Sequence, residues 1–166
     1  LAVPELRLGF SAYLQHLFQG MDLTDGAGNL SPLLLLANNL RACAVTMLYG
    51  LIPFVRLPAL ALGVNAVLLG GLAACYAATD TTMLLYAASL LPHGIFELPA
   101  LILAFSMGLY ICGHLTRRCR RDPAALPLGA CLGLAARLLV FLLLPLLILA
   151  ALTEAYVTPL AAGLFL

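Results

Sequence analysis

The order of hydrophobic and polar positions divides the chain into one amphipathic stretch and a series of long apolar tracts. Within residues 6–21 the apolar side chains recur at helical spacing, and Pro4 just before them suits the first turn of a helix. We expect an amphipathic helix that lies at the membrane interface or against the rest of the protein. Residues 22–32 are rich in turn-forming residues and predict a loop, so that residues 1–32 form one unit.

Two apolar tracts follow this loop, at residues 33–54 and 58–78. A membrane-spanning helix needs about 20 apolar residues, so each tract is long enough for one crossing. The turn between them, which contains Arg56, is short and predicts a tight antiparallel pair of helices. The small residues Gly70 and Gly71 in the second tract permit close packing against a neighbouring helix.

A third span is expected from Pro92 to about Leu115, because proline suits the first turn of a helix. The apolar segment at residues 83–91 is too short to cross a bilayer by itself. We expect this segment to lie in the membrane interface, ahead of the span.

The final tract, residues 126–166, is longer than one span but contains no polar turn that would divide it into two. We expect one long helix that bends near Pro145 and has a frayed or re-entrant end after Pro159. Gly129 and Gly133 in this tract are four residues apart, a spacing that permits close helix packing.

Composition strengthens the membrane interpretation. Hydrophobic residues make up 64% of the 166 residues and charged residues only 9%, whereas soluble domains average about 45–50% and about 25%. We therefore predict an all-α, polytopic transmembrane bundle of about four spans at residues 33–166, in the cell membrane and in contact with lipid. The chain starts at Leu1 without a charged region followed by a short apolar one, so we expect no signal peptide.

Positive charge gathers in one short loop between the third and fourth spans. All eight basic residues are arginine, and four of them lie in this loop: Arg117, Arg118, Arg120 and Arg121. The cluster is too short to predict a nucleic-acid partner. Positive charge beside a span favours the cytoplasmic side, so we expect this loop inside the cell and Asp80 outside.

The cysteines do not predict a metal site. The chain has five cysteines without a Cys-x-x-Cys pair. Cys112, His114 and Cys119 lie near one another in sequence, but their spacing fits no usual zinc pattern and the neighbouring arginines would repel a cation.

The informative residues are polar side chains inside the apolar spans, because each costs several kcal/mol, on the order of 2–4, unless it is paired, hydrated or used. His93 and Glu97 are four residues apart and therefore share one face of a helix. In the predicted topology the whole set maps to the outer half of the membrane: Asn38, Asn39, Arg41, His93, Glu97, Glu154 and Tyr156.

Four sequence blocks carry a resemblance to a known family. They are N-N-L-R at residues 38–41, Asn65 in a tract of small residues, L-P-H-G-I-F-E-L-P-A at 91–100 and E-A-Y-V-T-P at 154–159. With these blocks the chain resembles the stage II sporulation protein M family over most of its length. The resemblance implies a multispan membrane protein, and the named member of the family acts with peptidoglycan-degrading partners in the engulfment complex of spore formers. A five-span member would have one more span before residue 33.

The resemblance favours an integral membrane scaffold that anchors cell-envelope remodelling enzymes and requires no catalytic residue of its own. We expect a homo-oligomer, such as a dimer, and further membrane or peptidoglycan-remodelling partners. Whether the protein is itself an enzyme stays open at this point.

Three interpretations of the polar set remain open beside the scaffold. In the first, Arg41 neutralises the carboxylates of Glu97 and Glu154 in a structural network. In the second, His93, Glu97 and Glu154 bind zinc, with a fourth position left for water, as in an intramembrane hydrolase. In the third, the same side chains relay ions or protons in a transporter, with the helix broken near Pro92.

Overall fold

The computed structural model describes residues 30–77 and 83–163, and the secondary structure of these residues is helical, with no strand. The amphipathic helix expected within residues 6–21 lies outside the described residues. Four helical stretches are long and apolar enough to cross a membrane. The predicted all-α transmembrane bundle of about four spans is therefore confirmed.

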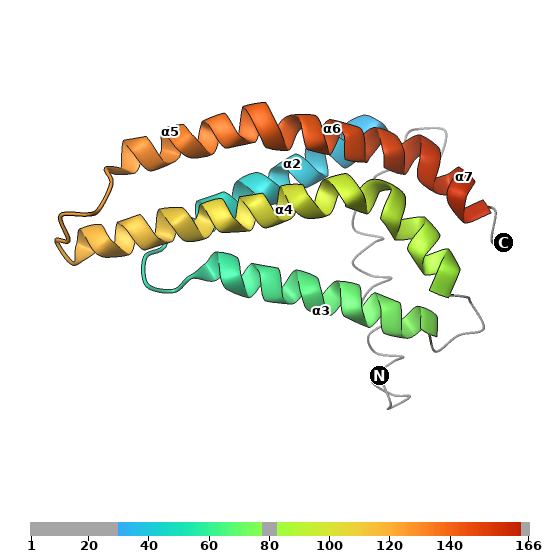
Figure 1. Cartoon of the computed structure of the whole chain (residues 1–166), viewed down its shortest axis with the longest axis horizontal. Coiled ribbons are helices and arrows are strands. Elements are labelled where there is room, and N and C mark those ends of the chain that lie inside the picture. The colour runs from blue at the N-terminus through green and yellow to red at the C-terminus, as the bar shows by residue number, and fades with distance from the viewer. Residues whose placement is uncertain (1–29, 78–82, 164–166) are drawn as a thin grey trace.

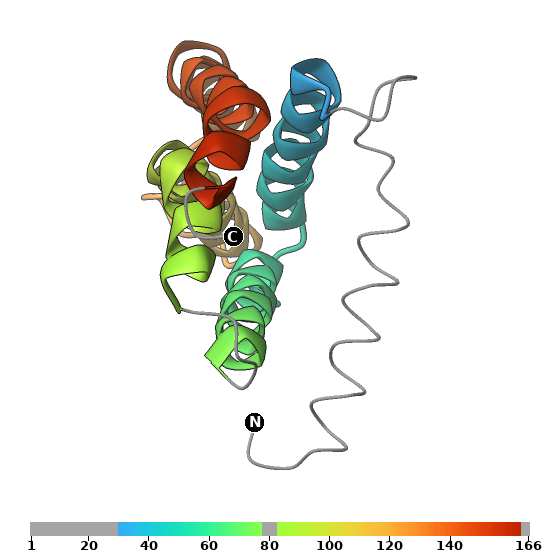
Figure 2. The same ribbon diagram turned by 90° about the vertical axis from the view of Figure 1, so that its right-hand side faces the viewer.

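The four stretches pack side by side along one direction (Figures 1 and 2). Helix α4 contacts each of the other helical elements, and in Figure 1 it lies between α3 and the last helical stretch. In chain order the elements are α2 (Pro32–Leu48), the 3₁₀ turn η1 (Tyr49–Leu51), α3 (Leu57–Ala77), α4 (Met83–Cys119), α5 (Leu128–Leu138), the π-helical turn η2 (Leu139–Leu143), α6 (Leu144–Leu152), the π-helical turn η3 (Thr153–Val157) and α7 (Thr158–Gly163).

The expected start of the third span is wrong. Helix α4 begins at Met83 and continues through both Pro92 and Pro99, so residues 83–91 are its first turns rather than a separate interfacial segment. Proline inside a helix removes one hydrogen bond and bends the axis. Figure 1 shows this bend in the N-terminal part of α4, which holds both prolines.

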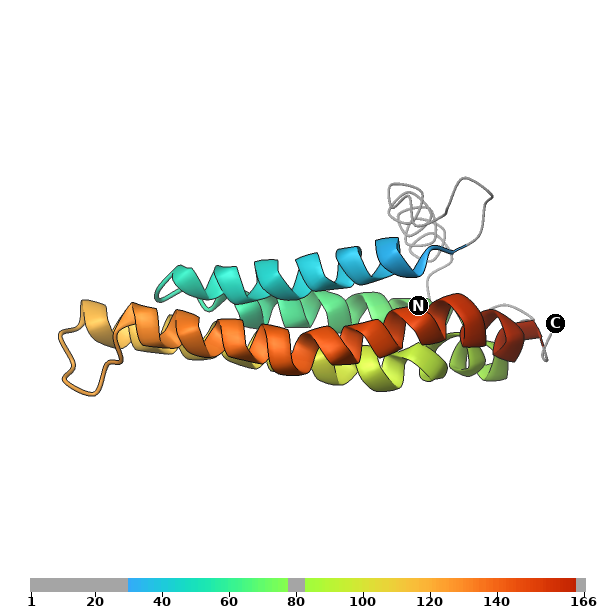
Figure 3. The same cartoon turned by 90° about the horizontal axis from the view of Figure 1, so that it is seen from above.

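The last apolar tract is one continuous helical stretch, as predicted, and between Pro159 and Gly163 the described chain stays helical rather than frayed or re-entrant. Elements α5 to α7 follow one another without a break as far as Gly163 (Figure 3). Both prolines follow a π-helical turn, η2 before Pro145 and η3 before Pro159. The carbonyl that each proline leaves without its usual N–H partner lies inside that π-helical turn, which locally replaces the regular hydrogen-bond ladder and lets the helix continue.

The turn between α2 and α3 is held by the far end of α4. Phe54 and Arg56 adopt left-handed backbone angles, with φ of 71° and 51°. The Phe54 N–H donates a 3.0 Å hydrogen bond to Oγ1 of Thr116, and the Arg120 guanidinium lies 5.8 Å from the centre of the Phe54 ring. These contacts hold the turn against α4 and make α2 and α3 antiparallel. The two helices pack mainly on α4 and leave a groove between them, so the tight pair that the short linker predicts is not formed.

The closest helix crossing lies where the end of α2 and η1 meet α4. A Cβ atom built on Gly108 would lie 2.7 Å from the carbonyl oxygen of Thr46 and 2.8 Å from Cγ of Pro58, and one built on Gly50 would overlap the backbone of Gly108. Around this crossing a core of small and aliphatic side chains is buried, including Cys43, Met47, Ala100, Ala104, Leu143 and Leu147.

The close packing expected at three other glycines does not occur within the described chain. A Cβ atom on Gly70, Gly129 or Gly133 would have no neighbouring atom within 4 Å. The spacing of small residues shows that a helix can be approached closely, but it does not show which face another helix of the same chain covers.

Replacing Gly108 with alanine should destabilise the bundle by roughly 1–3 kcal/mol, because the added methyl group meets backbone that cannot move aside. Thermal unfolding of the purified protein in detergent measures this effect. The matched control is Gly133→Ala, where the space is open and the gain in helix propensity, up to about 1 kcal/mol, should keep or raise stability. Equal stability of the two variants would contradict the close crossing.

The side of the membrane that the arginine loop faces stays a prediction, and Cys119 offers a test because its side chain is exposed. In a Cys75→Ala background, Cys119 should react with a membrane-impermeant maleimide in permeabilised cells but not in intact cells. Labelling in intact cells would place the loop outside and reverse the whole topology.

Candidate functional site

Three of the polar side chains predicted from the sequence come together at one place. His93 and Glu97 on α4 meet Glu154 on η3, and one ligand atom from each lies within 4.8 Å of the other two. All three side chains are half-buried between the two helical stretches. Glu154 follows Glu97 by 57 residues of chain, so the tertiary fold assembles this trio.

The spacing of His93 and Glu97 explains why they face one direction. They are four residues apart on α4, and Nε2 of His93 lies 3.9 Å from Oε2 of Glu97. That distance is too long for a hydrogen bond between the two atoms. The two side chains therefore leave a gap between them, on the side where Glu154 lies.

The position of Glu154 depends on the π-helical turn η3. Pro159 has no N–H for the carbonyl of Ala155, and the backbone responds with the wider turn Thr153–Val157. A π-helical turn adds a residue relative to a regular helix and so rotates the side chains that follow. Glu154, inside this turn, faces His93 and Glu97 on α4, whereas Tyr156 is 63% exposed.

The hydroxyl of Thr158 orients His93. Oγ1 of Thr158 lies 3.2 Å from Nδ1 of His93 and donates a hydrogen bond of 3.3 Å to the carbonyl of Thr153. A hydroxyl has one proton, so Thr158 accepts from His93 Nδ1–H. The lone pair of a neutral His93 is then on Nε2, the nitrogen that faces Glu97. We did not single out either threonine from the sequence, although Thr158 belongs to the E-A-Y-V-T-P block.

The remaining members of the predicted polar set do not join the trio. Asn38 and Arg41 on α2 are exposed and Asn39 is half-buried. Among the described residues Arg41 forms no ion pair with Glu97 or Glu154, and the same holds for Arg137 on α5. The structural network in which an arginine neutralises the carboxylates is therefore not present in the described part of the chain.

The trio lies far from the arginine loop. At about 1.5 Å per residue, Glu97 is roughly 27 Å along α4 from Leu115, close to the thickness of a hydrocarbon core of about 30 Å. The three side chains thus lie well away from the arginine loop along the bundle. Two carboxylates so close together, without an arginine partner among the described residues, need protons or a bound cation to balance their charge.

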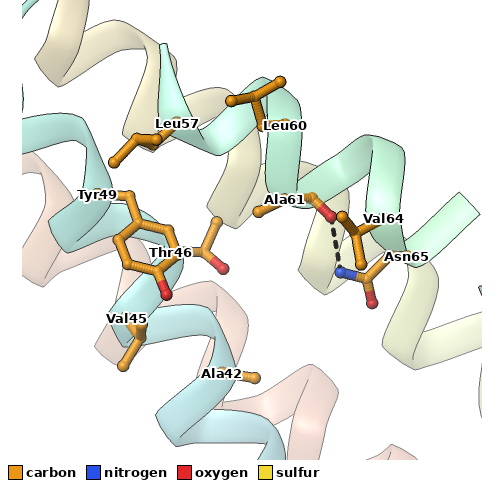
Figure 4. Close-up of a pocket in the computed structure, with 9 residues that line it drawn as sticks. All are labelled: Ala42, Val45, Thr46, Tyr49, Leu57, Leu60, Ala61, Val64 and Asn65. Carbon is orange, nitrogen blue, oxygen red and sulfur yellow. Dashed lines mark hydrogen bonds between the residues drawn. The ribbon is translucent and has the colours of Figure 1, made fainter. Parts of the chain in front are cut away.

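A separate apolar groove opens between α2 and α3. Its volume is about 590 Å³, and its walls include Val45 from α2, Tyr49 from η1, and Leu60, Val64 and Asn65 from α3 (Figure 4). The side chain of Asn65 donates to the carbonyl of Ala61 in its own helix, at 2.9 Å. None of the groove's lining residues belongs to the His93 trio.

Comparison with known proteins identifies one family. The family model for stage II sporulation protein M matches residues 10–159 of this chain. The match includes the four sequence blocks that carry the resemblance and extends toward the N-terminus beyond them. No curated protein and no solved structure gives a significant match.

Substitution of Arg41 with glutamine should change the free energy of unfolding by less than about 0.5 kcal/mol, because the exposed guanidinium balances no described carboxylate. Thermal unfolding in detergent measures the change, and Arg137→Gln on the exposed side of α5 is the matched control. A loss of about 3 kcal/mol or more in the Arg41 variant alone would indicate that it does pair with a buried carboxylate.

Proposed function

Because the chain belongs to the stage II sporulation protein M family, we propose that it is an integral membrane scaffold that holds cell-envelope remodelling enzymes in place. The protein is a multi-pass membrane protein of that family. The scaffold role and the partners are our proposal. The observation that carries it is the surface formed by α3 and the groove beside it.

Helix α3 is long enough to cross the membrane, but only 6% of its apolar stretch is buried inside the described chain. Gly63, Ala66 and Gly70 repeat at helical spacing along it, and Gly63 and Gly70 have open space where a side chain would start. In a membrane, small residues let two helices approach closely, and the gain comes from packing rather than from water release. This face of α3 suits a transmembrane helix of a partner protein.

The groove between α2 and α3 lies on another side of α3 from these small residues and offers a second surface for a partner. Aliphatic side chains such as Leu60 and Val64 form its walls, and Asn65 brings an amide to its edge (Figure 4). The hydrogen bond from Asn65 to its own helix uses one of the four positions that an amide offers. A partner helix with a polar side chain at this depth gains a hydrogen bond there, typically worth about 0.6–2 kcal/mol.

The two alternatives to a scaffold, an intramembrane hydrolase and a transporter, differ in the support that the structure gives them. The intramembrane hydrolase is favoured by the meeting of His93, Glu97 and Glu154 in one place. The transporter relied on a helix broken near Pro92, but α4 continues through that residue as a helix. The transporter has lost that support, so the hydrolase is the second candidate.

A photo-crosslinking amino acid at Val64 tests the scaffold proposal in native membranes. Val64 is 58% exposed and lines the groove beside α3; the matched control is Phe141, which is 78% exposed on η2. We expect Val64 to give a crosslinked product with a membrane-anchored peptidoglycan-remodelling enzyme, identified by mass spectrometry. Phe141 should give no such product, and Asn65→Leu should weaken the Val64 product several-fold.

Two kinds of crosslinking result would contradict the scaffold proposal. A product of twice the chain's own mass would assign the groove beside α3 to self-association, the homo-oligomer that we also expected from the sequence. Products of equal yield at Val64 and Phe141, or lipid adducts alone, would show that this groove has no dedicated protein partner.

A further inference from the structure

We propose that His93, Glu97 and Glu154 form a site for one divalent transition-metal ion, for which zinc is the best match. This inference concerns the opposite end of α4 from the arginine loop and is independent of the α3 face. It rests on three features of the described residues: the positions of the ligand atoms, the orientation of His93 and the charge balance.

The ligand atoms are close to the positions that zinc requires. One atom from each of the three side chains lies within 4.8 Å of the other two. Zinc binds nitrogen and carboxylate oxygen at about 2.0–2.2 Å, so two ligands on a tetrahedral ion are about 3.4 Å apart. A contraction of at most about 1.4 Å, within reach of side-chain rotations of the two glutamates, brings the three atoms onto one ion.

The orientation of His93 is the one that a metal ligand needs. Thr158 accepts from Nδ1–H of His93 and is itself oriented by the carbonyl of Thr153. Histidine ligands commonly hold their second nitrogen in such a hydrogen bond, which fixes the ring and leaves the other lone pair for the metal. Here the free lone pair is on Nε2, and it points into the gap toward Glu97.

Charge balance distinguishes this site from an ordinary ion pair. Two carboxylates and a neutral imidazole carry a charge of −2, which one divalent cation cancels completely. The described chain offers no arginine partner to either carboxylate. A neutral complex is the arrangement that a low-dielectric membrane tolerates best.

The donor set favours zinc over the common hard cations. Calcium takes six to eight oxygen ligands and magnesium prefers octahedral oxygen with retained water, whereas zinc accepts one nitrogen and two carboxylate oxygens. Three protein ligands leave a fourth position open to water, as in catalytic zinc sites. Two other candidate ligands on α4 are already hydrogen-bonded: Nδ1 of His114 accepts from the Leu126 N–H, and Sγ of Cys112 donates to the carbonyl of Ile52.

The test is zinc binding to the full chain in detergent, after removal of metal with a chelator and equilibrium dialysis against zinc. Elemental analysis should give about one zinc per chain, and zinc should raise the melting temperature in proportion to the logarithm of its free concentration. His93→Ala, Glu97→Gln and Glu154→Gln should each abolish stoichiometric binding. Thr158→Val should weaken it about 10–100-fold, because it removes the hydrogen bond that orients His93.

Two controls keep the outcome decisive if a ligand variant folds poorly. Tyr156→Phe changes an exposed neighbour of the trio and should bind zinc like the wild type. Cobalt in place of zinc reports the ligands directly, and Glu154→Asp should change its visible absorption while binding is retained. Less than stoichiometric zinc in the wild type, or zinc that is lost with Cys112→Ala and retained in His93→Ala, would overturn the proposal.

Discussion

The close crossing of α4 with the end of α2 at Gly50 and Gly108 is the contact on which the rest of the bundle depends. A membrane gives little hydrophobic drive for one apolar helix to leave lipid for another, so stability comes from close packing of backbone and side chains. At this crossing the backbones come so near that a single added carbon would overlap. Because α4 contacts each of the other helical elements, the remaining spans pack along this helix.

The polar trio lies where prolines interrupt the regular helices. Pro92 and Pro99 bend the N-terminal part of α4, where His93 and Glu97 lie. Glu154 faces them from the π-helical turn before Pro159, and Thr158 within the same segment orients the imidazole. The irregularities of the backbone in this region therefore lie beside the side chains of the trio. The resulting arrangement supports a membrane protein that both presents a lateral face to partners and holds a cation.

The sequence predicted the helical class, the four spans and the three trio residues, because apolar length and misplaced polar residues are visible without a structure. It did not predict that α4 starts at Met83, since a proline reads equally well as a helix start or as an interior bend. It also did not show that Arg41 faces outward, because that depends on how α2 is rotated about its axis. The role of Thr158 required the position of His93 in space, 65 residues away.

X-ray absorption at the zinc edge on the purified, zinc-loaded protein tests directly whether His93, Glu97 and Glu154 bind the ion. We predict nearest neighbours of nitrogen and oxygen at about 2.0–2.1 Å, a contribution from one imidazole ring, and no sulfur. A sulfur contribution at about 2.3 Å, or a shell of oxygen atoms alone, would contradict this prediction, because the ion would then be held elsewhere in the protein or by solvent.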